Sequence, residues 1–111
     1  MMYFYADYVP VMKAMSDETR LKIIDMLSCG EMCACEILKE LSISQSTLSY
    51  HMKILTQSGL VNAVRDGAWV RYTLNNEKID ELKMFFEYIT SEKEDCICKS
   101  CEKNKDDKHS C

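Results

Sequence analysis

The sequence predicts one mainly α-helical domain that carries a small β-hairpin. Apolar residues recur at helical spacing through most of residues 3–58 and again over 76–90. Between these regions, two strand-like runs flank Asp66-Gly67, a pair that is a strong local hairpin signal. With 111 residues, 47% of them hydrophobic, the chain is long enough for one domain with a real core, and two independent domains are not expected.

The first two helices are expected over residues 3–15 and after Ser16. The run YFYADY at residues 3–8 makes the first helix unusually apolar for an exposed end, and Pro10 should break or bend it. Ser16 is the expected N-cap of the second helix, with acidic residues in the first turn. Helical spacing predicts burial of three residues in this helix: Leu21, Ile24 and Leu27.

Two further helices are expected at about 33–41 and 45–58, joined by the short connection 42–44. The strands LVNAVR (60–65) and AWVRYTL (68–74) follow directly. A helix pair with a short turn, followed by a hairpin and a last helix, is the order of a winged helix-turn-helix.

The last helix should span 76–90 and carry one apolar stripe. The stripe consists of Ile79, Leu82, Phe85, Phe86 and Ile89. Beyond it the composition changes to Lys, Asp, Glu and Cys, so residues 93–111 are expected to form a mobile tail after a domain of residues 1–92.

The composition argues against several classes of protein. No apolar stretch approaches the roughly 20 residues of a membrane-spanning helix, and no signal peptide is recognisable. Seven cysteines are an odd number and too few for a secreted disulfide scaffold, so reduced thiols in the cytoplasm are expected. The two histidines, without a paired acid and base or a phosphate-binding glycine loop, argue against an enzyme.

The net charge of −4 argues at first against a nucleic-acid partner. The charge is unevenly distributed, however: residues 42–74 hold three bases and one acid, whereas both flanking segments are acidic. The predicted helix-turn-helix and hairpin thus form the only net-positive third of the chain.

Helical phase separates two faces of the helix at 45–58. Leu48, Met52 and Leu55 should face the core, and an acid-free polar face remains that suits the major groove. The alternative is that this polar face is only the solvated side of a surface helix. The adjacent hairpin with its two arginines favours the DNA-binding interpretation. The expected DNA-contacting residues are Gln45, Ser46, Thr47, Ser49, Tyr50, His51, Lys53, Arg65 and Arg71, with packing as an alternative role for His51.

The segments SDETRLKIIDML, EMCACEIL, LSISQSTLSYHMKILTQSGLV and RDGAWVRYTL resemble the ArsR/SmtB family of metal-sensing repressors over residues 12–75. The resemblance implies a homodimer that binds double-stranded operator DNA and leaves it on binding an inducer. It also implies DNA contacts at the positions of Gln45, Ser46, Ser49 and Tyr50, and dimerisation through the first and last helices.

Cys33 and Cys35 lie in a stretch that resembles the metal box of this family. Thiolates select soft ions, so the expected inducer is As(III) (or Sb(III)), with Cd(II), Pb(II) or Zn(II) as alternatives. Residues i and i+2 of a regular helix point about 200° apart, so the two thiols can share an ion only where the helix start is irregular.

The arsenic-sensing box has a third cysteine where this chain has Leu38. Cys29 and the tail cysteines are candidates for the missing ligand, from the same or the other subunit. The tail residues that we place among the metal ligands are Cys96, Cys98 and Cys101. The extra N-terminal cysteines and the His-rich last helix of other family sensors are absent from this sequence.

Two other functions remain open at this stage. A repressor of the same fold could sense oxidation or persulfide through paired thiols. Alternatively, the tail could buffer metal or hold a structural site without any part in sensing.

Overall fold

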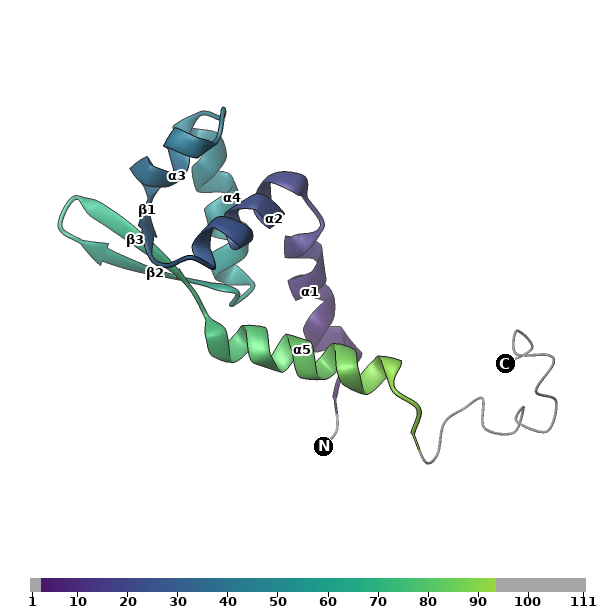
Figure 1. The fold of residues 1–111 in the computed structure, drawn as a ribbon. Coiled ribbons are helices and arrows are strands. Elements are labelled where there is room, and N and C mark those ends of the chain that lie inside the picture. The colour runs from purple at the N-terminus through teal and green to yellow at the C-terminus, as the bar shows by residue number, and fades with distance from the viewer. Residues whose placement is uncertain (1–2, 94–111) are drawn as a thin grey trace.

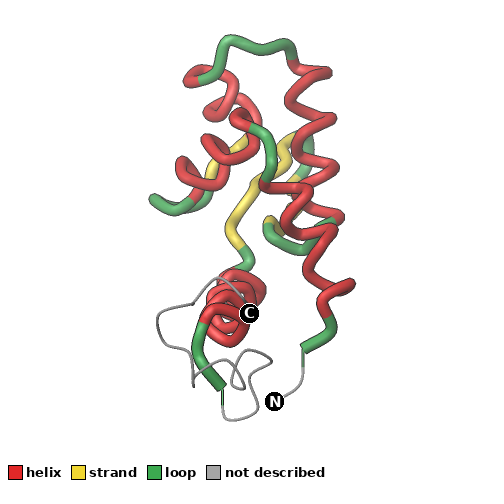
Figure 2. The backbone as a smooth tube through the Cα atoms, turned by 90° about the vertical axis from the view of Figure 1, so that its right-hand side faces the viewer, coloured by secondary structure: helices red, strands yellow, loops and turns green. Residues whose placement is uncertain are grey.

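The computed structural model describes residues 3–93, and its architecture is the predicted winged helix-turn-helix (Figure 1). The elements in chain order are α1 (Tyr5–Met15), α2 (Glu18–Leu27), β1 (Met32–Cys33), α3 (Ala34–Glu40), α4 (Gln45–Gln57), β2 (Val61–Asp66), β3 (Trp69–Leu74) and α5 (Asn76–Thr90). Helices α2, α3 and α4 lie together, the β2–β3 hairpin projects to one side, and α5 lies beneath them, seen end-on in Figure 2.

Two expectations for the first two helices were wrong, and of the break or bend expected at Pro10 the break is absent. Helix α1 continues through Pro10, because buried Tyr8 and Val11 anchor both sides of the proline. The N-cap of α2 is Asp17, whose carboxylate accepts a hydrogen bond from the Arg20 backbone N–H at 3.1 Å, and not Ser16. Leu21 is 47% exposed.

Leu21 is exposed because the buried face of α2 is centred on Ile23 and Leu27. A residue two positions before Ile23 lies about 200° around the helix and therefore points toward solvent. Ile24 is half-buried and packs at the edge of the core.

The sheet has three strands in the order β1-β3-β2, all antiparallel. Strand β1 was not predicted, because a two-residue strand is too short to show a periodic pattern. In the β2–β3 hairpin Asp66 pairs with Trp69, so the turn residues are Gly67 and Ala68, one position later than predicted. Gly67 adopts φ +64°, a left-handed conformation that favours glycine at this turn.

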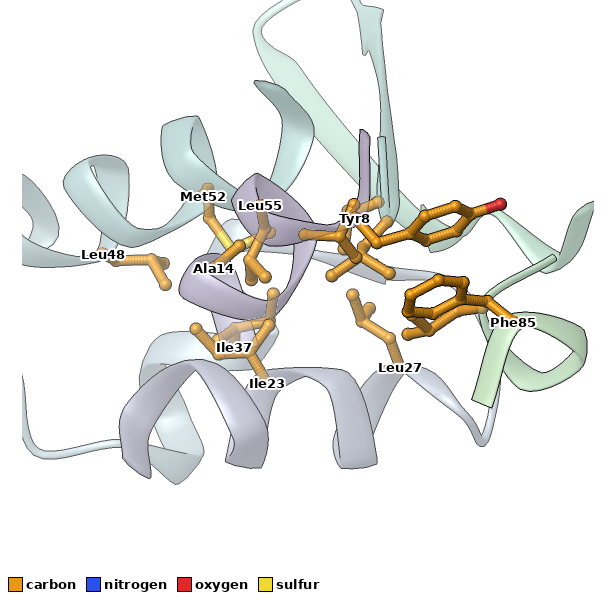
Figure 3. Close-up of a cluster of buried hydrophobic side chains, with 13 residues drawn as sticks. Tyr8, Ala14, Ile23, Leu27, Ile37, Leu48, Met52, Leu55 and Phe85 are labelled. Atoms are coloured by element: carbon orange, nitrogen blue, oxygen red, sulfur yellow. The ribbon is translucent and has the colours of Figure 1, made fainter. Parts of the chain in front are cut away.

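One core joins all five helices (Figure 3). Ile23, Ile37, Leu48 and Leu55 are almost completely buried between α2, α3 and α4. Toward the N-terminus the core becomes aromatic: the rings of Tyr8 in α1 and Phe85 in α5 stack at 4.0 Å between centroids. The core therefore fixes α4 against α2 and α3, and α1 against α5.

The start of α5 yields a prediction for stability. The side chain of Asn75 accepts a hydrogen bond from the Lys78 backbone N–H at 3.3 Å and caps the helix. Asn75→Ala should lower the free energy of unfolding by about 1 kcal/mol, measured by urea unfolding at fixed protein concentration. Asn75→Asp should retain most of the stability and Asn76→Ala should change it little; an equal loss in Asn76→Ala would contradict the capping role.

Candidate DNA-binding surface and thiol pair

Helix α4 presents a continuous polar face to solvent. Its N-cap Ser44 accepts a hydrogen bond from the Thr47 backbone N–H at 3.1 Å, and Leu48, Met52 and Leu55 are buried as predicted. The exposed residues from the start of α4 to Lys53, which we call the recognition face, are Gln45, Ser46, Thr47, Ser49, Tyr50 and Lys53. This face carries hydrogen-bonding groups and one positive charge, and no carboxylate.

His51 does not share this face. The residue is only 8% exposed, and its Nδ1 atom lies 3.0 Å from Nη1 of Arg20 and 3.9 Å from a carboxylate oxygen of Asp17. Its ring also packs edge-on against that of Tyr50. These contacts assign His51 to the packing of α4 against α2, the alternative role that the sequence left open.

The β2–β3 hairpin forms the wing. Arg65 and Arg71 are both exposed, and Arg71 lies 3.4 Å from a carboxylate oxygen of Glu31 and 3.8 Å from one of Asp66. Trp69, near the tip of the wing, is 55% exposed and was not among the predicted site residues. The alternation of β3 could have revealed it, because Trp69 shares its face with Arg71.

A hollow of about 260 Å³ lies where α4 meets the wing. It is lined by Ser49, Met52, Lys53 and Thr56 from α4 and by Ala63 and Tyr72 from the wing. The recognition face and the wing are therefore neighbouring parts of one surface.

Cys33 and Cys35 lie together at the start of α3. Cys33 is buried, Cys35 is exposed, and their Sγ atoms are 2.6 Å apart. The two thiols converge because the helix begins at Ala34: Cys33 is the N-cap, with extended backbone angles of φ −88° and ψ 164°. The irregular helix start that a shared site requires is present. We call Cys33 and Cys35 the thiol pair.

Glu36 completes a capping box around this helix start. Its carboxylate accepts a hydrogen bond from the Cys33 backbone N–H at 2.9 Å, and this bond is the main reason why the pKa of Glu36 is lowered. The hydrogen bond with Cys35, together with burial, raises the pKa of the Cys33 thiol. The spacing Cys33-x-x-Glu36, with cysteine in the usual place of serine or threonine, is the sequence signal that could have revealed this box.

The thiol pair is not completed within residues 3–93. In that range no three His, Cys, Asp or Glu side chains are arranged so that they could hold a metal ion. Cys29 is exposed in the turn after α2 and does not join the pair. Cys96, Cys98 and Cys101, the other predicted ligands, lie outside the described residues.

Cys33 of the thiol pair joins the wing directly and is linked to α4 through α3. Cys33 pairs directly with Arg71 in the β1–β3 ladder and thereby joins the wing. It also caps α3, the helix that packs against α4 through buried Ile37 and Leu48. Cys33 therefore lies between the wing and the helix that packs against α4.

The fold and this surface define a winged helix-turn-helix DNA-binding protein. A model of the arsR family of bacterial regulatory proteins matches residues 17–63. The arsenical resistance operon repressor of Staphylococcus aureus is 40% identical over 96 residues, which cover 86% of this chain and 92% of that protein. The chain therefore belongs to the arsR family of transcriptional regulators, whose members are DNA-binding proteins and not enzymes.

One further sequence relative and one solved structure are also similar to this chain. A cadmium resistance transcriptional regulatory protein of S. aureus, a CadC homolog, is 36% identical over 77 residues, covering 68% of this chain and 64% of that one. The solved structure of HlyU from Vibrio cholerae N16961 matches with a TM-score of 0.66 and 33% identity, over 81% of this chain and 98% of that chain. Within residues 3–93, no helix has the length and apolarity to cross a membrane.

Proposed function

We propose that this regulator is a homodimeric repressor that binds operator DNA and is released when soft-metalloid ligation occupies the thiol pair, with arsenite (or antimonite) as the inducer. The observation that carries the proposal is the convergence of Cys33 and Cys35 at the start of α3, with Sγ atoms 2.6 Å apart. Two adjacent thiols suit soft ions, and the similarity to an arsenical resistance repressor favours arsenite.

The recognition face is proposed to enter the major groove. Gln45, Ser46, Thr47, Ser49 and Tyr50 present hydrogen-bonding groups to base edges, and Lys53 neutralises a phosphate. Arg65 and Arg71 of the wing add phosphate contacts. This distribution reconciles an acidic chain with DNA binding, since the acids lie mainly outside this surface.

Dimerisation is proposed through α1 and α5. Both helices, together with the N-cap of α1, leave large apolar side chains exposed, and several exceed 40% exposure: Phe4 (the N-cap), Tyr5, Val9, Met84 and Phe86. Apolar side chains gathered on two contacting helices are typical of a protein–protein interface. A second copy would bury them and place two recognition faces on one duplex.

The third ligand is proposed to come from the cysteine-rich segment 93–111, which follows the DNA-binding domain of residues 1–92. Cys96, Cys98 and Cys101 supply three thiols within six residues, and arsenite needs one more donor than the thiol pair offers. Cd(II), Pb(II) and Zn(II) are alternative inducers that would use further tail cysteines. Similarity to a cadmium resistance regulator supports testing Cd(II) beside arsenite.

The proposal is tested with a duplex enriched from a random pool by the wild-type protein. The labelled duplex is held by the reduced dimer, and arsenite, Cd(II), Pb(II) and Zn(II) are added separately while fluorescence anisotropy reports release. We expect arsenite to release the DNA at the lowest concentration. Failure of every ion to do so would contradict the proposal.

A redox-sensing repressor is the second candidate, because the same sulfur proximity favours disulfide formation. Hydrogen peroxide would oxidise the two thiols to one S–S bond, and the two thiol protons would leave in the two water molecules formed. Release by peroxide without release by any of the four ions would favour this candidate over metalloid sensing.

The pH dependence of inducer affinity distinguishes arsenite from a divalent metal ion. The raised pKa of Cys33 keeps this thiol protonated at neutral pH, so Cd(II) must displace its proton. Affinity for Cd(II) should therefore rise about tenfold per pH unit for each proton released. Neutral arsenous acid forms As–S bonds while its hydroxyl groups leave as water with the thiol protons, so its affinity should be nearly constant between about pH 6 and 8. Equal pH slopes for both inducers in direct titrations would contradict this chemistry.

Trp69, the only tryptophan in the chain, reports on the wing. It lies two residues from Arg71, which pairs with Cys33 across the β1–β3 ladder. Arsenite should change the emission of Trp69 in the wild type and leave it unchanged in Cys33→Ser. An identical change in both proteins would show that the signal does not come from the thiol pair.

A further inference from the structure

The side chain of Arg20 joins three helices. From α2, its Nε donates a hydrogen bond to the carbonyl oxygen of Ala14 at 2.6 Å, and its Nη2 donates one to that of Lys13 at 3.5 Å. Its Nη1 lies 3.0 Å from Nδ1 of His51 in α4. One guanidinium therefore bridges the C-terminal end of α1 to the middle of α4.

The guanidinium donates to carbonyl groups in the last turn of α1, which have no i+4 N–H partner within the helix. The carbonyl of Lys13 also accepts a hydrogen bond from the backbone N–H of the C-cap Ser16 at 3.2 Å, so the 2.6 Å bond to Ala14 is the main link from Arg20 to α1. Because arginine only donates hydrogen bonds, Nδ1 of His51 is the acceptor in this contact. The donors of the planar guanidinium are fixed relative to one another, so meeting these acceptors together restricts the relative position of α1 and α4.

His51 lies directly behind the recognition face. It is buried, while its neighbour Tyr50 is 60% exposed and in ring contact with it at 5.3 Å. A carboxylate oxygen of Asp17, the N-cap of α2, lies 3.9 Å from the same Nδ1 atom of His51. The cluster is thus held to the first turn of α2 while it contacts α4 from the interior.

We propose that Arg20 is a positioning residue for DNA binding, which fixes the angle between α4 and α1 through His51 and the carbonyls of Lys13 and Ala14. The inference rests on the proposed function of the recognition face and of α1 in dimerisation. In a dimer built on α1 and α5, this angle sets the separation of the two recognition faces, which must match two successive major grooves. Arg20 therefore acts on operator affinity without touching DNA.

The test compares Arg20→Met, Arg20→Lys and His51→Leu on the duplex enriched by the wild-type protein. Each variant should bind about tenfold more weakly at 25 °C, at a temperature and concentration where it is folded and its oligomeric state is that of the wild type. Lysine should not rescue binding, because its ammonium cannot reproduce the fork. His51→Asn, which keeps an acceptor near the position of Nδ1, should retain most of the affinity.

Lys22→Met is the matched control, since it removes an exposed positive charge from the same helix. It should leave affinity unchanged, and an equal loss in Lys22→Met would assign the effect to charge and overturn the proposal. The double variant Arg20→Met/His51→Leu should bind no more weakly than either single variant, because both remove the same bridge. Additive losses, or wild-type affinity in the folded single variants, would also overturn the proposal.

These outcomes are distinct from failure of the proposed function. If substitutions on the recognition face itself left binding intact, the proposed DNA surface would be wrong. If those substitutions abolished binding while folded Arg20 and His51 variants bound normally, only the positioning role would be wrong.

Discussion

Replacing Cys33 by serine should abolish release from DNA by arsenite and leave operator affinity without inducer nearly unchanged. Serine keeps the small size of the N-cap and is itself a preferred N-cap residue, so α3 should still begin at Ala34. The hydroxyl is a poor ligand for a soft metalloid. The measurement is the arsenite concentration that releases half of the labelled duplex, which should rise beyond the accessible range.

Cys35→Ser should show the same loss of response, since Cys35 is the other half of the thiol pair. Cys29→Ser is the matched control, because Cys29 is exposed and does not join the pair. A wild-type arsenite response in Cys33→Ser would contradict sensing at the start of α3. Such a result would mean that arsenite acts through cysteines outside the described residues.

Placing two acids on the recognition face should weaken operator binding about a hundredfold or more. In Ser46→Glu/Ser49→Glu, two hydrogen-bonding groups are lost and two negative charges face the phosphates. Each substitution should reduce the free energy of DNA binding by about 1–3 kcal/mol. Both serines are exposed, and Ser46 lies in the first turn of α4, where glutamate favours the helix. Unfolding is therefore not the expected cause of the loss, which anisotropy titration would measure.

The matched control adds the same two charges at the ends of α5. Asn76 and Ser91 are both exposed and lie outside the recognition face and the wing. Asn76→Glu/Ser91→Glu should reduce affinity only slightly, by the general effect of net charge. Equal losses of operator affinity in the two double variants would contradict the proposal that α4 contacts the DNA.

Much of the fold was predictable because its periodic patterns are long. The phase of α4 was assigned correctly from Leu48, Met52 and Leu55, since three apolar residues over two turns leave one solution for the buried face. In α2 the apolar residues Leu21, Ile23, Ile24 and Leu27 surround much of the helix, so their spacing did not single out Ile23.

The site was less predictable, because its geometry depends on contacts between distant residues. The sequence placed Cys33 and Cys35 together but could not show that β1 precedes the helix and pairs Cys33 with Arg71, 38 positions away. The partner of His51 is Arg20, 31 positions earlier, and no local pattern connects them. Such contacts become visible only when the chain is folded.

The most direct test of thiol-based induction follows ligation and release in one sample. Reduced protein bound to the labelled duplex is titrated with arsenite while arsenic–sulfur absorbance and DNA anisotropy are recorded together. Both signals should change over the same arsenite concentrations in the wild type, and Cys33→Ser should show neither release nor the full absorbance. Complete ligation at Cys33 with the DNA still bound, or release without arsenic–sulfur absorbance, would contradict the account.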